Sequence, residues 1–358
     1  MLGAMPIFGR RVQPSFSSAP VQAAAGASQV GNFLTYSVGA SELRALQNPV
    51  ISRSRDLIAS MIGSLELKQY QKQWTGEDYE EIYIPNETWM DRPDPRVTRN
   101  FFFANLFSDL FFYGRCFAYV TLRNASDNRP AAFTWLPAAS VSTPNQQGPQ
   151  WFGPPDEIEF NGMMLNPADV IVGLSPIMGL LYAGARALTI SERLEESAAR
   201  FAQNEIAAGY LQQKGGEPMT ADELGELAAG WASARRANAI GALNEYVEYV
   251  EFKADPSKLQ LVEGREHQDL NLSRIANIPP YLLGITTGGM TYQNAQQARQ
   301  DLYLFGAKPY IDCLEQTFSM DNVLPRGRYV EFDVESFLEE NSMSDRSNDR
   351  NNDEVSTS

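Results

Sequence analysis

GLSPIMGLLYAGARALTISERLEESAARFA, residues 173–202, opens the part of the sequence that decides the fold of this chain. Ser175 and Pro176 are typical of a helix start, because a serine hydroxyl caps free backbone N–H groups and proline is tolerated in the first turn. Apolar residues then recur on one side and charged residues on the other, up to about residue 205. At roughly 1.5 Å per residue, such a helix spans on the order of 45 Å. This exceeds what a small domain needs, so we predict an elongated molecule.

A small insert follows this helix. GYLQQ (209–213) and EYVEYVEF (245–252) are rich in strand-forming residues, and Thr220 and Glu223 form the T-x-x-E capping box of a helix between them. Alternation along the second strand places four residues on one face: Tyr246, Glu248, Val250 and Phe252. The glutamates of this strand are equally well explained as protection of its edge against unwanted pairing. We predict a strand–helix–strand insert between two long helices.

The second long helix is predicted to start at Asp255 and Pro256, which repeat the capping pattern, and to end before Pro279. The two glycines of TTGGMT (286–291) then predict a loop, and a third helix follows from residue 292 with a kink at Pro309. An amphipathic stripe must pack against something, and one elongated chain cannot cover both long helices by itself. A second copy of the chain is the expected partner.

Residues 46–174 have the pattern of a compact α+β unit. Asn48 and Pro49 predict a helix start, and Gly63 predicts its end. Six phenylalanines between residues 96 and 113 surround a helical period, so this helix is predicted to be buried on every side. An exposed stacking platform for nucleic-acid bases is the alternative, but such platforms need flanking cations. Strands are predicted at 65–74, 80–85, 116–122, 131–136 and 167–174.

The two ends of the sequence differ from the rest. Residues 1–45 are rich in Gly, Ala, Ser and Pro and show little periodicity, which indicates a flexible arm that orders on a partner. Residues 339–358 have almost no apolar content and several acidic residues, so a disordered tail is expected.

The order of these elements, together with several short motifs, resembles the tailed-bacteriophage portal proteins of the HK97-like group. The most specific motifs are GLSPI (173–177), IPPYLLG (278–284) and TYQNAQQAR (291–299). The resemblance extends upstream through NPVISRSRDLIASMIGSLELKQY (48–70) and LFFYGRCFAYVTLRN (110–124), and covers about residues 45–335. Each motif alone is weak, and their order and spacing together are specific.

The resemblance implies an α+β, portal-like protomer. Its parts are the arm (1–45), the wing (46–174), stem helix 1 (175–206), the clip (207–253) and stem helix 2 (254–284), then the tunnel loop (285–291), the wing helix with a short crown region (292–338) and the acidic tail (339–358). The short, polar region after Asp333 departs from the family pattern, which argues against a well-developed crown. The long arm has no counterpart in that pattern.

The function that the resemblance implies is structural. Portal proteins form a dodecameric ring at a capsid vertex, and double-stranded DNA is packaged and ejected through the ring. The implied partners are further copies of this chain, the major capsid protein, the terminase large subunit, head–tail connector or adaptor proteins, and DNA bound without sequence specificity. The implied location is the virion, with assembly in the host cytoplasm and no membrane contact.

The resemblance also implies roles for particular residues. The tunnel loop that lines the channel corresponds to Ile285, Thr286, Thr287, Gly288, Gly289, Met290 and Thr291. Partner docking on the clip corresponds to Thr220, Glu223, Tyr246, Glu248, Val250 and Phe252. On the stem, Lys258, Arg265 and Arg274 either contact the DNA backbone or form salt bridges between helices.

Charge and cysteine content bound these expectations. Acidic residues outnumber basic ones by 44 to 29, which gives a net charge of -15. Tight nucleic-acid binding rests on clustered Lys and Arg, so DNA is expected to slide past this protein. Cys116 and Cys313 are the two cysteines and lack metal-ligand spacing, and Cys116 is predicted to be a small core residue. No apolar run approaches the roughly 18 residues that span a bilayer.

Catalytic motifs are absent from the sequence. It contains no phosphate-binding G-x-x-x-x-G-K-[ST] loop, no G-x-G-x-x-G, no H-E-x-x-H and no G-x-S-x-G. His267 is the one histidine, and a solvated helix residue explains it better than a general base. We therefore expect no catalytic residues, no cofactor and no enzyme activity. Two alternatives stay open: another virion structural protein, such as a minor head or adaptor component, and a soluble enzyme with an unfamiliar site.

Overall fold

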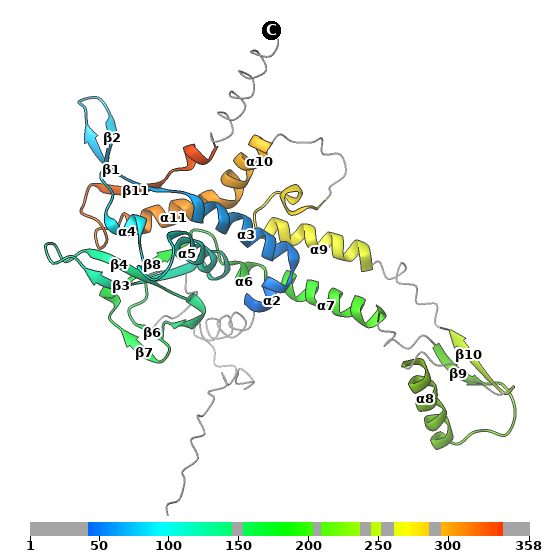
Figure 1. Cartoon of the computed structure of the whole chain (residues 1–358). Helices are drawn as coiled ribbons and strands as arrows, with labels where there is room; N and C mark the ends of the chain where they lie inside the picture. The colour runs from blue at the N-terminus through cyan, green and yellow to red at the C-terminus, as the bar shows by residue number, and fades with distance from the viewer. Residues whose placement is uncertain are drawn as a thin grey trace, which may run out of the picture.

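The computed structural model describes residues 42–144, 153–202, 209–236, 245–251, 261–285 and 295–338. Helices and three three-stranded sheets form a body, from which α7 (Ala185–Ala202) and α9 (Leu261–Ile275) extend side by side (Figure 1). A small unit of β9 (Gly209–Gln213), α8 (Ala221–Arg236) and β10 (Val247–Glu251) lies beyond their far ends (Figure 1). The α+β class and the elongated shape agree with the sequence-based predictions.

Helix α5 (Arg99–Tyr113) lies at the centre of the body. The Thr98 hydroxyl accepts a hydrogen bond from the N–H of Phe101 at 3.2 Å, and Gly114 ends the helix in the left-handed conformation, with φ 72°. Five of its phenylalanines are at most 1% exposed: Phe102, Phe103, Phe107, Phe111 and Phe112. Phe101 is 46% exposed and meets Trp135 edge-on at 6.1 Å. The predicted burial therefore holds for five of the six rings.

The rings of α5 join elements that are distant in the sequence. Phe103 packs edge-to-face on Phe318 of α11 (Lys308–Phe318) at 5.8 Å and on Phe332 of β11 (Arg328–Phe332) at 5.4 Å. Phe107 meets Tyr310 of α11 at 5.1 Å. Because aromatic rings bury large apolar areas, this cluster attaches the C-terminal elements to the N-terminal half of the body.

Helix α3 (Pro49–Ser64) packs along α5, and the short α2 (Glu42–Gln47) precedes it. The predicted cap is confirmed: the Asn48 side chain accepts hydrogen bonds from two backbone N–H groups of the first turn, at 2.9 and 3.3 Å. The helix ends one residue after Gly63, close to the predicted end. A Cβ at Gly63 would lie 2.6 Å from Oδ1 of Asn100, so glycine lets the two helices approach closely.

Two sheets flank this helical core. In the first, β3 (Arg115–Arg123) is the central strand, and β4 (Pro130–Leu136) and β8 (Val170–Leu174) pair with it antiparallel. These are three of the predicted strands. Cys116 on β3 is 3% exposed, as predicted for a core residue. A small third sheet contains β5 (Val141–Ser142), β6 (Ile158–Phe160) and β7 (Met163–Leu165).

In the second sheet, the predicted strands β1 (Leu67–Trp74) and β2 (Tyr79–Ile84) form a hairpin, with Gly76 in its turn at φ 107°. The third strand, β11, pairs with β1 and was missed, because its residues were assigned to a wing helix and crown region. Its sequence RYVEF alternates in the manner of a strand, so a signal was present. The short α4 (Thr88–Asp91) follows β2.

The first long helix begins later than predicted. The Ser175 hydroxyl accepts a hydrogen bond from the N–H of Ile177 at 3.1 Å, but the helix α6 (Leu180–Ala183) starts five residues further on, and Gly184 separates it from α7. The delay has a tertiary cause. The Ser175 N–H is bonded to the Gly114 carbonyl at 2.9 Å, and a Cβ on Gly179 would lie 2.5 Å from the Phe112 carbonyl oxygen. The chain is therefore held against the end of α5 before the helix starts.

The second long helix ends before Pro279, as predicted. It stops at Ile275, and Asn277 has a φ of 56°, well before Pro279. The 3-10 turn η3 (Pro280–Leu283) follows and ends at the left-handed Gly284. The predicted start at Asp255 and Pro256 lies outside the described residues.

The third long helix is divided into three parts. α10 (Ala295–Asp301) passes through a π-helical segment, η4 (Leu302–Ala307), into α11. Pro309 has no N–H to donate to the Phe305 carbonyl, which lies four residues earlier. The side chain of Asn277 donates to this carbonyl instead, and so links the end of α9 to α10–α11. The predicted disturbance near Pro309 thus takes the form of a π-helical segment.

Two buried charged residues lie at the C-terminal end of α5. The Asp109 carboxylate accepts hydrogen bonds from Nε1 of Trp135 at 2.7 Å and from the N–H of Ala138 at 3.1 Å. Burial raises the pKa of Asp109 well above its usual range. Arg115 donates to Oγ1 of Thr143 at 3.2 Å, and burial lowers the pKa of its guanidinium to about 10. These groups connect α5 to the segment around β5.

Glu315 of α11 has a pKa close to neutrality. Its Oε1 accepts a hydrogen bond from the N–H of Phe332 at 2.8 Å and thereby fastens β11 to α11. Burial raises the pKa of Glu315 from 4.5 to about 7, against the opposing effect of that hydrogen bond. Because the folded-state pKa is the higher one, the contribution of this group to stability is complete below 4.5 and is lost as the pH rises through about 7.

We predict that Glu315→Gln flattens the decline of stability with pH in this window. Glutamine keeps an acceptor for the Phe332 N–H but carries no charge. The melting temperature of the variant should exceed that of the parent near pH 8, and the difference should shrink near pH 5. Thermal unfolding followed by circular dichroism measures this difference. Glu335→Gln, at an exposed residue of the same region, is the control. Parallel pH profiles for all three proteins would contradict the assignment.

Candidate functional site: the paired helices and the strand–helix–strand insert

The two long helices are joined by polar contacts within one chain. Nε and Nη2 of Arg265 on α9 both lie 2.8 Å from Oε1 of Glu195 on α7. Closer to the body, the side-chain amide of Gln268 donates to the Ala187 carbonyl at 2.8 Å. A Cβ at Gly264 would be in ordinary contact with the side chain of Leu194, at 3.8 Å. The helices are therefore paired along facing sides.

Other sides of these helices expose apolar side chains. Ile190 on α7 is 40% exposed and Val262 on α9 is 65% exposed. Glu192 and Arg193 are exposed beside Ile190. Within the described residues, one chain thus leaves these apolar side chains to solvent. This is the arrangement from which a second copy was predicted.

The insert is a two-stranded antiparallel sheet, β9 and β10, covered on one face by α8. β9 and β10 pair antiparallel, with Val247 opposite Gln213 and Tyr249 opposite Leu211. The Tyr249 ring lies 5.3 Å from that of Trp231 on α8. The predicted capping box is present: the N–H of Thr220 donates to Oε2 of Glu223 at 2.8 Å. These two residues thus start α8.

The described residues predicted for partner docking lie at the start of α8 and on one face of the β9–β10 sheet. Val247 and Tyr249 are directed to α8, so alternation places Tyr246, Glu248 and Val250 on the opposite face. Tyr246 is 46% exposed and packs beside the turn, where a Cβ on Gly215 would lie 3.0 Å from its Cδ1. Glu248 forms an ion pair with Lys214. The sixth predicted residue, Phe252, lies outside the described residues.

The predicted cations and the predicted loop are described in part. Arg265 bridges the two helices, and Nη1 of Arg274 donates to Oδ1 of Asn271 on its own helix at 3.1 Å. Lys258 and residues 286–291 lie outside the described residues. Ile285, the first residue of the predicted loop, packs against the core, and its N–H donates to the Pro280 carbonyl at 3.0 Å. The point at which this loop leaves the body is therefore fixed.

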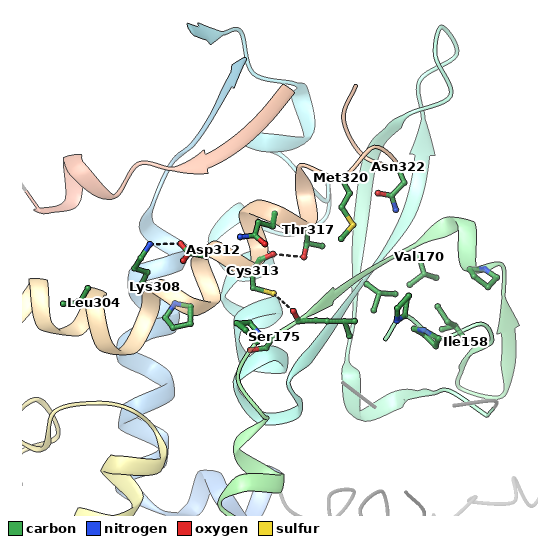
Figure 2. Close-up of a pocket in the computed structure, with 18 residues that line it drawn as sticks. Ile158, Val170, Ser175, Leu304, Lys308, Asp312, Cys313, Thr317, Met320 and Asn322 are labelled. Carbon is green, nitrogen blue, oxygen red and sulfur yellow. Dashed lines mark hydrogen bonds and ion pairs between the residues drawn. The ribbon is translucent and has the colours of Figure 1, made fainter. Parts of the chain in front are cut away.

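A cavity of 890 Å³ lies between β8 and α11 (Figure 2). Its wall is mainly apolar, and Lys308 and Asp312 form an ion pair of 3.1 Å at one side. The Cys313 thiol donates to the Leu174 carbonyl at 3.2 Å, and burial raises its pKa to about 11. A protonated thiol is a weak nucleophile. His267 is exposed on α9, far along the sequence from both cysteines.

The described residues hold no group of three or more His, Cys, Asp or Glu placed to bind a metal ion. None of their helices combines the length and the apolar character that a membrane span requires.

Comparisons with known proteins agree with this geometry. The family model described as phage portal protein matches residues 49–347, and the chain belongs to this family. The chain also has the fold of an HK97-family portal protein. A crystal structure of such a protein from Corynebacterium diphtheriae superposes with a TM-score of 0.68 at 21% identity, covering 84% of this chain and 98% of that one.

Further relatives come from other particles. The probable portal protein of Streptomyces phage phiC31 is 24% identical over 193 residues, which are 52% of this chain and 41% of the relative. The chain thus matches about two fifths of that curated relative. Chains from the neck of a gene transfer agent, one computed with C6 symmetry in the empty particle and one with C12 symmetry in the native particle, both give a TM-score of 0.57 at 18% and 17% identity. They cover 87% and 86% of this chain and 89% and 88% of their own length.

The contact between Trp231 and Tyr249 yields a local prediction. Trp231→Ala should loosen α8 from the β9–β10 sheet, because this sheet has little other cover. The aromatic core of the body is untouched. Hydrogen exchange should become faster in residues 209–213 and 247–251, and the main melting transition should stay in place. Leu224→Ala, at a residue of α8 that is 43% exposed, is the matched control. A shift of the main transition in Trp231→Ala would show instead that the insert and the body unfold together.

Proposed function

We propose that copies of this chain close into a ring through which double-stranded DNA enters and leaves a phage capsid. The family supplies the class of protein, and the observation that carries the proposal is the exposed outer face of the paired helices. Ile190 and Val262 are left to solvent by a helix pair whose facing sides are already joined. Head-to-tail contacts between identical copies cover such faces. When the rotation from one copy to the next divides a full turn evenly, the copies close into a ring. The C12 symmetry of the gene transfer agent neck supports a dodecamer.

In this proposal each part has a separate task. The body is the wing, α7 and α9 are the stem, and residues 207–253 are the clip. The far position of the insert, beyond the ends of the stem helices, makes it accessible to other proteins (Figure 1). It is the docking surface for the terminase large subunit during packaging and for head–tail connector proteins afterwards. The body faces the major capsid protein, and the assembled ring is located at the virion vertex.

The proposed action on DNA is mechanical. An acidic chain with a net charge of -15 adheres weakly to phosphate, which favours passage over retention. The loop of residues 285–291 contacts the duplex without reading bases, and leaves the body at the anchored Ile285. Lys258 and Arg274 are the stem residues proposed for weak contact with the DNA backbone. Arg265 has a bridging role, which its ion pair with Glu195 supports.

The ring is tested by imaging and by an interface variant. Electron microscopy of purified protein should show closed rings with an axial hole. Ile190→Glu should shift the population toward single chains in sedimentation velocity, because it buries a charge in the proposed interface. Its circular dichroism should be unchanged, since Ile190 is 40% exposed in one chain. Leu122→Glu, at a residue of the body that is 60% exposed, is the control. A monomeric parent protein would refute the ring, and another closed assembly would favour a minor head or adaptor component.

The loop is tested separately from the ring. Replacing both Gly288 and Gly289 by proline should impair DNA packaging or retention in infected cells, because proline fixes the backbone that these glycines leave free. Purified rings of the variant should look like those of the parent. Normal packaging of a full genome by this variant would contradict the role of the loop without affecting the ring.

A further inference from the structure

The outward face of the sheet β11-β1-β2 carries five aromatic side chains. Trp74 is opposite Tyr79 in the register, and Tyr70 is opposite both Tyr83 and Tyr329. Directly opposed residues point to the same side of a sheet, and residues 70 and 74 on β1 are an even number apart. All five rings therefore share one side, which we call the aromatic face. The hairpin β1–β2 that bears most of it projects from the body (Figure 1).

The inner half of the aromatic face is occupied by cations of the sheet itself. Tyr70 stacks on Tyr329 with ring centres 5.4 Å apart. Nζ of Lys72 lies 5.4 Å from the centre of the Tyr329 ring, and Nζ of Lys68 lies 5.8 Å from that of Tyr83. The sheet thus shows how these rings hold a positive charge.

The outer half of the aromatic face is the Trp74–Tyr79 pair. Its rings attract a positive charge in the same way, but no Lys or Arg of the described residues lies over them. Trp74 and Tyr79 meet edge-to-face at 5.0 Å and are 55% and 62% exposed. The cation–ring contacts that the structure shows do not include either of them. Glu77 and Asp78 are exposed in the turn beside this pair, and the ion pairs of the described residues leave both carboxylates out. Glu80, which is opposite Gln73 in the register, points to the other side of the sheet.

Exposed aromatic rings beside carboxylates fit a cationic partner. A guanidinium over a Trp or Tyr ring is attracted by the negative face of the ring, and Arg stacks there better than Lys because it is planar. Tyrosine and tryptophan are also the residues that dominate protein interfaces. A segment with arginine next to apolar residues would use both the rings and the carboxylates.

One segment of this chain has that composition. Residues 1–41, outside the described structure, contain Arg10 and Arg11 and neither Asp nor Glu. Their side-chain charge is +2, so the remaining chain carries -15 minus 2, or -17. The sequence IFGRRV (7–12) places apolar residues on both sides of the two arginines. From Arg11 to Glu42, where the described chain begins, an extended chain of 31 residues reaches on the order of 100 Å. This length reaches the hairpin of its own or of an adjacent copy.

We propose that residues 7–12 dock on the Trp74–Tyr79 pair, with Arg10 and Arg11 over the rings and beside Glu77 and Asp78. The hairpin tip is then a receptor for the N-terminal segment of this chain, and the contact fastens that segment to the body. The proposal does not depend on the ring, because a single chain has both halves of the contact.

Disulfide trapping in the full-length protein tests this contact. A cysteine is placed in the segment with Val12→Cys and a second at the exposed hairpin tip with Thr75→Cys. Cys116 and Cys313 are buried and stay out of the reaction. The matched control joins Val12→Cys with Leu122→Cys, at another exposed residue of the body. Mild oxidation should link the first pair and leave the control pair free, and the mass of the product shows which copy supplies the segment.

Charge reversal separates docking from random collision. Arg10→Glu with Arg11→Glu should lower the yield of the linked product about tenfold, the effect of losing two exposed cation–ring contacts. Adding Glu77→Lys should restore part of the yield. Trp74→Ala with Tyr79→Ala should lower it without changing the melting temperature, since both rings are largely exposed. A yield equal to the Leu122→Cys control, or a yield indifferent to the charge reversal, would overturn the proposal and leave the tip to a different protein.

Discussion

The structure depends on the burial of five phenylalanines on a single helix. Rings of α5 pack against Tyr310 and Phe318 of α11 and against Phe332 of β11, and each ring of this size buries about 150 to 250 Å² of apolar surface. This cluster holds the last third of the chain against the first. Because α7 and α9 lie between those two parts in sequence, both of their inner ends are anchored to the same core.

The anchoring explains why two long helices project in a defined direction. At one inner end, the Gly179 backbone is held against the end of α5, and the Ser175 N–H is bonded to the Gly114 carbonyl. At the other inner end, the side chain of Asn277 donates a hydrogen bond to the Phe305 carbonyl, to which Pro309 cannot donate because it has no N–H. Away from the body the helices are joined by the Arg265–Glu195 pair, and one chain leaves their outer sides exposed. The buried core thus lies in the body, while the projecting helices keep exposed apolar residues.

Most elements were predictable because their signals are local. The Asn48 cap, the Thr220–Glu223 capping box and the buried strands beside α5 depend on neighbours within a few residues, and the structure has all of them. The predicted docking residues of the insert were less well resolved by sequence. Alternation gave the faces of β10, but it did not show that Thr220 and Glu223 serve the helix start, or that Glu248 is paired with Lys214. The strand β11 has a local alternation of its own, but its pairing with β1, some 260 positions away, is not contained in local sequence.

The sequence by itself determined the α+β class, the order of the elements, the buried aromatic helix and the family, since periodicity, caps and motif spacing are properties of short segments. Tertiary structure decided where the long helices start and end. Ser175 and Pro176 have the chemistry of a helix start, yet the contact with α5 delays the helix to Leu180, and the second helix stops at Ile275. Tertiary structure also decided which aromatic rings stay exposed. Phe101 and Trp74 have the same aromatic character as the buried rings of the core, but no other element packs over them fully. Long-range packing sets these features, and no window of local sequence contains it.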